Sequence, residues 1–148
     1  TCRTEVRQVM EVELGHDAID VSKRIGKKGI ELKASVKKAL LKTALQGINI
    51  IEDRTKKGRG LKGFFPKYSP KYLAFRASKG RGKNVDLQFT GQMLGSITAV
   101  ATSNYAEIYF SRGAEAKKAA MVSKKRPFFG FSRRERKQLG EIFFKALK

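Results

Sequence analysis

Residues 29–53 read GIELKASVKKALLKTALQGINIIED, and their apolar side chains recur at spacings of three and four. That spacing places them on one face of an α-helix, with lysines interspersed between them. Gly47 lowers helix stability by about 1 kcal/mol relative to alanine, so we expect a bend or a close packing contact there. The face that this long helix is predicted to bury consists of Leu32, Val36, Ala39, Leu40, Ala44, Ile48 and Ile51.

A second helix is predicted at the carboxyl end of the chain. Ser132 and Glu135 have the spacing of a capping box, in which each side chain accepts a hydrogen bond from the other residue's backbone N–H. We expect Arg126, Pro127 and Phe128 to fix the turn into this helix. The residues of the turn predicted to be core and subunit contacts are Phe128, Phe129 and Phe131, with Gly130 between them. The apolar stripe of the helix is Leu139, Ile142, Phe143, Ala146 and Leu147.

Alternating apolar and polar residues predict β-structure in two places. Residues 6–14 have the two-residue period of a half-buried strand. Residues 96–102 and 105–110 flank a Ser-Asn turn, which indicates an antiparallel hairpin. The second hairpin strand is expected to place Tyr105, Glu107 and Tyr109 on one face and Ala106, Ile108 and Phe110 on the other.

These elements predict an α+β fold in a single domain, residues 1–148, with an amino-terminal strand, a long central helix, an antiparallel hairpin and a carboxyl-terminal helix. A short helix is expected at residues 17–25, where Asp17 can cap the first turn. Thr90 with the following Gly91 is predicted to begin a brief helical turn that places Met93 and Leu94 inward.

Two basic segments are predicted to be extended arms, ordered by partners, at residues 54–84 and 112–126. The first combines glycines, prolines and clustered cations. Within it, Tyr68 precedes Ser69-Pro70, a pair typical of a helix N-cap followed by a proline at the first helical position. The side chains predicted to anchor this short helix on the core, with base stacking as the alternative, are Tyr72, Leu73 and Phe75.

Charge narrows the class of partner. Lys and Arg number 33 against 13 Asp and Glu, which gives a net charge of +20. Such a chain attracts nucleic acid or acidic protein surfaces, and the attraction weakens with salt. The cations that we single out as candidate partner or DNA contacts are Lys56, Lys57, Arg59, Lys62, Lys67, Lys71, Arg76, Lys79, Arg81, Lys83, Lys117, Lys118, Lys124 and Lys125.

Catalytic residue patterns do not emerge from the sequence. The single histidine, His16, excludes any triad or metal site that needs two imidazoles, and the single cysteine, Cys2, excludes a thiolate zinc cluster. The carboxylates form no recognisable metal-binding motif, and the glycine-rich pieces at 58–60 and 80–82 do not match a phosphate loop. We therefore expect no enzyme activity, no cofactor and no metal, and no run of apolar residues predicts a membrane span.

Three pieces of the sequence, taken in order, resemble the tail-completion or virion-morphogenesis proteins of tailed bacteriophages, a family of neck components that connect head and tail. They are FFPKYSPKY followed by VDLQFTGQMLGSI, then NYAEIYF, and finally RPFFGFSRRE. The resemblance covers roughly residues 64–136. Its structural positions are Tyr68, Ser69, Pro70, Thr90, Gly91, Tyr105, Arg126, Pro127, Phe128, Gly130, Ser132 and Glu135.

The resemblance implies a homo-oligomer that forms a ring, sixfold or a multiple of six, around the axis through which DNA passes. Its implied partners are other phage neck, portal and tail proteins, with packaged double-stranded DNA as a further candidate contact. The implied location is the head-tail junction of the virion, after synthesis in the host cytoplasm.

Two other functions remain open from the residues alone. A basic nucleic-acid-binding protein of the ribosomal type would share the charge and the basic loops. A metal-dependent nuclease is the third alternative, and it would require scattered carboxylates to converge in the fold.

Overall fold

The computed structural model describes residues 10–11 and 29–147, and the fold is α+β. In chain order the elements are β1 (Met10–Glu11), α2 (Gly29–Lys56), β2 (Arg59–Gly60), β3 (Gly63–Phe64), α3 (Pro70–Ser78), α4 (Gln92–Gly95), β4 (Ile97–Ala101), β5 (Ala106–Phe110), α5 (Gly113–Lys125) and α6 (Arg133–Leu147). Most of the predicted strand 6–14, the predicted helix 17–25, Cys2 and His16 lie outside the described residues.

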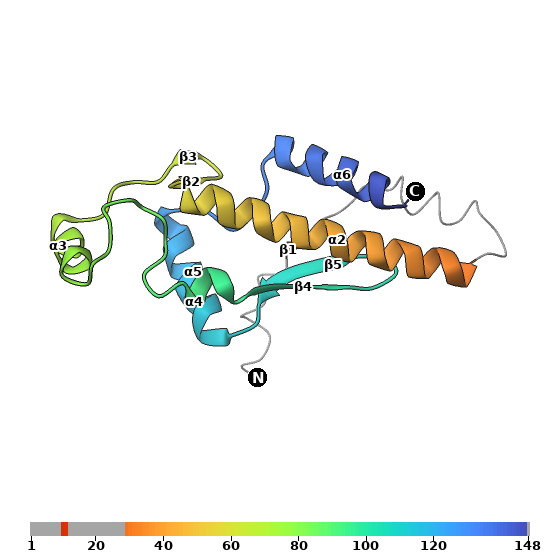
Figure 1. Cartoon of the computed structure of the whole chain (residues 1–148), viewed down its shortest axis with the longest axis horizontal. Coiled ribbons are helices and arrows are strands. Elements are labelled where there is room, and N and C mark those ends of the chain that lie inside the picture. Colours follow the sequence, from red (N-terminus) through yellow and green to blue (C-terminus); the bar gives the residue numbers. More distant parts are fainter. Residues whose placement is uncertain (1–9, 12–28, 148) are drawn as a thin grey trace.

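Helix α2 confirms the long predicted helix and lies between α6 and the β4–β5 hairpin (Figure 1). Its buried face includes Ala39, Leu40, Ala44, Ile48 and Ile51, as the apolar spacing predicted. The predicted close contact at Gly47 is also present. A Cβ atom built there would lie 2.7 Å from Phe131 Cζ and 3.2 Å from Ile108 Cδ1, so only glycine leaves room for these two side chains.

The main sheet has the order β1-β5-β4, and both pairings are antiparallel. In the β4–β5 hairpin Ile97 pairs with Phe110 and Ala101 with Ala106, which confirms the predicted hairpin. Ala106 and Ile108 are buried, Phe110 packs at the edge of the core, and Tyr105 on the opposite face is exposed. The predicted division of β5 into an inner and an outer face therefore holds.

Helix α6 begins with the predicted capping box. The Glu135 N–H donates to Ser132 Oγ over 3.3 Å, and the Ser132 N–H donates to Glu135 Oε2 over 2.7 Å. Leu139 and Phe143 are each 1% exposed, because they pack into the hydrophobic cluster together with α2. Burying a side chain of this size stabilises the fold by about 1.5–3 kcal/mol.

The two predicted extended arms need correction. Residues 113–125 form the regular helix α5, not an extended arm. In the segment 54–84, α2 continues to Lys56, β2 and β3 form a small hairpin, and α3 occupies Pro70–Ser78, where the sequence predicted a short helix. The turn before β4 also differs by one residue from expectation: its N-cap is Gly91, with φ +78°, although Thr90 Oγ1 accepts a hydrogen bond from the Gln92 N–H over 3.4 Å.

Candidate docking surface

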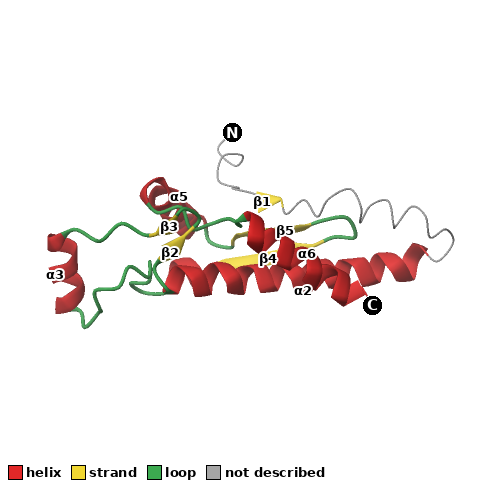
Figure 2. Ribbon diagram, turned by 90° about the horizontal axis from the view of Figure 1, so that it is seen from above, coloured by secondary structure: helices red, strands yellow, loops and turns green. Residues whose placement is uncertain are grey.

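Residues 66–91, called the arm from here on, leave the body of the molecule and return to it. In both views α3 stands apart from the layers formed by α2, α6 and the sheet (Figures 1 and 2). Ser69 caps α3 by accepting a hydrogen bond from the Tyr72 N–H over 3.3 Å, and Pro70 occupies the first turn. The local sequence therefore builds the helix, but α3 itself contributes nothing to the hydrophobic cluster.

Arg76 holds the arm together from within. It is 1% exposed, and its guanidinium donates to the Gly82 carbonyl over 3.1 Å, to the Gln88 carbonyl over 3.3 Å and to Asp86 Oδ1 over 3.1 Å. Because these bonds use the planar fork of the guanidinium, they tie α3 to the returning segment of the arm. Arg76 is thus an internal structural residue, and its prediction as a partner or DNA contact is wrong.

The aromatic side chains of the arm pack on one another. Tyr68 and Tyr72 meet edge to face with ring centroids 4.9 Å apart, and Phe75 stacks on Phe89 at 5.4 Å. Phe75 remains 48% exposed. The predicted anchoring of α3 on the core by its apolar side chains is therefore incorrect, because the buried residue of this helix is Arg76.

Arg126 joins the arm to the end of α5. Its side chain donates to the Pro66 carbonyl over 3.1 Å and to the Lys67 carbonyl over 3.0 Å, and it lies 4.9 Å from the centroid of the Tyr68 ring. Burial raises the pKa of Tyr68, whose hydroxyl accepts a hydrogen bond from the Leu87 N–H. The Arg126 side chain therefore fixes the base of the arm rather than the turn into α6 that the sequence suggested.

The turn into α6 is held by Arg54, which the sequence reasoning did not single out. Its guanidinium donates to the carbonyls of Phe128 and Gly130 and forms an ion pair with Glu135. Burial acts to raise the pKa of Glu135, but the hydrogen bonds from Ser132 and Arg54 and the charge of Arg54 outweigh it, so the pKa is lowered. Pro127 contributes through its carbonyl, which accepts a hydrogen bond from the Leu61 N–H.

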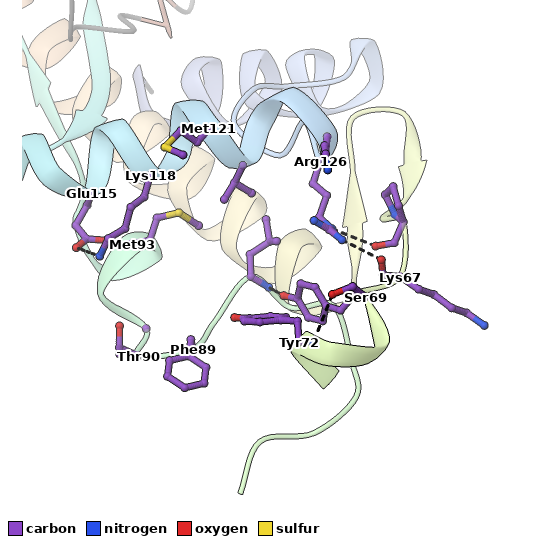
Figure 3. A pocket seen from close by; sticks show the side chains of 16 residues that line it. Lys67, Ser69, Tyr72, Phe89, Thr90, Met93, Glu115, Lys118, Met121 and Arg126 are labelled. Atoms are coloured by element: carbon purple, nitrogen blue, oxygen red, sulfur yellow. Dashed lines mark hydrogen bonds and ion pairs between the residues drawn. The ribbon is translucent and has the colours of Figure 1, made fainter. Parts of the chain in front are cut away.

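An open groove of about 960 Å³ lies between the arm, α4 and α5 (Figure 3). Its apolar lining includes Leu87, Phe89, Met93, Met121 and Val122, and Met121 is 70% exposed. The sequence predicted that Met93 is buried, which the structure confirms, but gave no sign that Phe89 and Met121 share a groove. The polar rim of the groove carries Lys67, Glu115, Lys118, Lys125 and Arg126.

The structure separates the predicted contact cations into three groups: the buried Arg76, two lysines paired with carboxylates, and the exposed remainder. The paired lysines are Lys56, which pairs with Glu52, and Lys118, which pairs with Glu115. The other candidates, Arg76 aside, are exposed and lie on three parts of the surface, the β2–β3 region, the arm and α5: Lys57, Arg59, Lys62, Lys67, Lys71, Lys79, Arg81, Lys83, Lys117, Lys124 and Lys125. At the β2–β3 hairpin, the Arg59 guanidinium lies 4.6 Å from the centroid of the Phe64 ring, which is 75% exposed.

Within residues 10–11 and 29–147, no three His, Cys, Asp or Glu side chains gather in a group that could hold a metal ion. In that same part of the chain, no helix combines the length and the apolar character needed to cross a membrane. Comparison with protein-family models, with curated proteins and with solved structures found no match.

Proposed function

We propose that this chain is a structural subunit of a bacteriophage virion neck. It forms a ring, sixfold or a multiple of six, between the head and the tail around the DNA channel. Its partners are further copies of itself and other neck, portal and tail proteins, and its place is the head-tail junction. It performs no catalysis and needs no cofactor.

One observation carries the proposal: the sequence pieces that resemble tail-completion proteins contact one another at the base of a projecting arm. Arg126, from the last piece, binds backbone carbonyls next to Tyr68, from the first. Phe129 packs on Phe110, from the middle piece, with ring centroids 4.9 Å apart. Residues far apart in the sequence thus fix the position of the arm, whose exposed surface the described part of the chain leaves uncovered. Docking to neighbouring subunits requires such a surface.

Nucleic-acid binding without ring assembly is the second candidate. The β2–β3 hairpin favours it, because an exposed aromatic ring beside an arginine can stack on a base while cations contact phosphates. The exposed arm cations Lys79, Arg81 and Lys83 are suited to phosphate contacts in either case.

Size measurement of the purified chain separates the two candidates. Mass photometry over a range of protein concentrations, followed by negative-stain imaging, should reveal closed rings. A matched pair of variants locates the contact: Phe75→Ser in the arm should reduce ring formation, whereas Ile30→Ser, at the opposite end of α2, should not. A chain that stays monomeric at every concentration and binds RNA or DNA would refute the neck proposal in favour of the second candidate.

The role of the arm cations is measured separately. Replacing Lys79, Arg81 and Lys83 by glutamine should lower the slope of log affinity for duplex DNA against log salt by up to about 3, since each phosphate contact contributes about 0.9. The control triple, Lys33, Lys37 and Lys42 to glutamine on α2, makes the same charge change away from the arm. An identical slope for both triples would exclude a specific role for the arm cations in DNA contact.

A further inference from the structure

The groove between the arm and α5 has an apolar floor and a positive rim. Phe89, Met93 and Met121 line the groove (Figure 3), and Met121 is 70% exposed, whereas Met93 is buried and Phe89 stacks on Phe75. Methionine is unbranched and polarisable, so such a surface adapts to the apolar side chains of a bound peptide. Met121 is the apolar side chain of this lining that the described residues leave most exposed.

The rim of the groove carries four cations and one carboxylate. Glu115 forms an ion pair with Lys118 over 2.8 Å, and Arg126 bonds only to backbone carbonyls, which leaves its charge unneutralised. Lys67 and Lys125 are exposed and have no carboxylate partner in the described part of the chain. The groove is therefore complementary to a segment that combines carboxylates with apolar side chains.

One segment of this chain has that composition. Residues 12–20 read VELGHDAID, and they hold Glu13, Asp17 and Asp20 together with Leu14 and Ile19 but neither lysine nor arginine. In this chain of net charge +20, no nine-residue stretch after residue 20 holds more than two carboxylates. These residues lie outside the part of the chain that the structure describes.

We propose that residues 12–20 of a second copy of the chain dock in this groove. The carboxylates pair with Lys67 and Lys125, and the apolar side chains cover Phe89, Met93 and Met121. The inference deepens the proposed function, on which it rests for a chain that assembles with itself, and it names the contact between neighbouring copies.

The length of the connecting chain decides whether residues 12–20 of the same copy or of a second copy can occupy the groove. Helix α2 has 28 residues and is about 42 Å long. The elements that line the groove, the arm, α4 and α5, lie near the Lys56 end of α2, opposite the end where Gly29 begins the helix (Figure 1). Only eight residues lie between Asp20 and Gly29, and the nine residue steps from one to the other span at most about 31 Å when fully extended. Asp20 of the same chain therefore falls short of the groove, whereas a neighbouring copy has no such restriction.

A fluorescent peptide with the sequence of residues 9–22 tests this contact by anisotropy against the full-length chain. We expect saturable binding that weakens with salt. The double variant K67E/K125E should weaken it on the order of 10-fold or more, because two attractive charges become repulsive. The control K33E/K37E alters the net charge equally on an exposed face of α2 and should leave the affinity nearly unchanged. Both cations of each pair are exposed, so folding is not at stake.

Charge reversal makes the test specific. A peptide with Glu13, Asp17 and Asp20 replaced by lysine should not bind the unmodified chain but should bind K67E/K125E. Met121→Ser should weaken the original peptide without changing its salt dependence. The inference would be overturned if the peptide does not bind, or if the control pair weakens binding as much as K67E/K125E. It would also be overturned if an oligothymidylate displaces the peptide and itself requires Lys67 and Lys125.

The proposed function can fail independently of this contact. Rings that form while the peptide does not bind would remove the groove contact and leave the neck proposal standing. Peptide binding by a chain that never closes into rings would support the contact and count against the neck proposal.

Discussion

Replacing Arg76 with methionine should loosen the arm while leaving the body of the protein folded. The change keeps the length of the side chain but removes the donors that reach Gly82, Gln88 and Asp86. At a net value of about 1 kcal/mol for each hydrogen bond, the free energy of opening the arm falls by about 3 kcal/mol. Local opening of this kind exchanges backbone amides with solvent, so protection of the arm amides should fall roughly 100-fold.

Hydrogen exchange followed by mass spectrometry measures this effect on peptides from residues 66–91. The melting temperature should change little, because the arm contributes only Val85 and Leu87 to the edge of the hydrophobic cluster. Arg81→Met is the matched control, since Arg81 is an exposed arginine of the same arm. Unchanged protection of the arm in R76M, or an equal loss in R81M, would refute the internal role assigned to Arg76.

Three further predictions concern the body of the fold. The folded-state pKa of Glu135 is lowered, so its ionised form adds stability that is complete above about pH 4.3, the ordinary glutamate value, and is lost as pH falls through the lower folded pKa. Urea titrations should therefore show a steeper loss of stability in acid for the unmodified chain than for E135Q. The control E141Q, on an exposed face of α6, should behave like the unmodified chain. Gly47→Ala should destabilise the fold by about 1–3 kcal/mol in the same titrations because it crowds Phe131, whereas Gly140→Ala, where no atom lies within 4 Å of the added Cβ, should stabilise it by about 0.5–1 kcal/mol. Ser132→Ala should lower the free energy of unfolding by about 1 kcal/mol, because it removes the cap of α6. Ser78→Ala is the control, since the Ser78 hydroxyl bonds only at an exposed helix end. A smaller loss of stability in S132A than in S78A would contradict the capping role.

Elements with a strong local pattern could be predicted from the sequence. The long helix, the β4–β5 hairpin and the capping box at Ser132 and Glu135 each depend on residues close together in the chain, and each has the predicted form. The close contact at Gly47 could be predicted as a possibility, because glycine in a helix otherwise only weakens it. Its partners, Phe131 and Ile108, could not, since they come from distant segments.

Helix α5 was missed although the sequence contained a signal. Residues 113–125 hold four alanines and four lysines, which favour helices, but their charge directed the interpretation toward an extended arm. Arg76 was misassigned for a related reason. A cation in a basic segment looks like a surface residue, and only the fold shows that Asp86 and two carbonyls surround it.

The candidate docking surface depends most on contacts between distant residues. Arg126 meets backbone carbonyls about 60 residues earlier in the chain, and the groove combines side chains from the arm, α4 and α5. Backbone carbonyls carry no residue identity, so a sequence pattern cannot reveal them as partners. The cations of the rim were all predicted contact or motif residues, but the apolar floor between them was not predicted as a surface.

The packing of α6 on α2 has a consequence for synthesis of the chain. The two helices are separated by residues 57–132, and α6 is translated after the other described elements. At about 5–20 residues per second, a ribosome needs several seconds to make the intervening stretch and α6 itself. During that interval the side of α2 that later contacts Leu139 and Phe143 is uncovered, so the nascent chain carries an aggregation-prone apolar surface until α6 has been made.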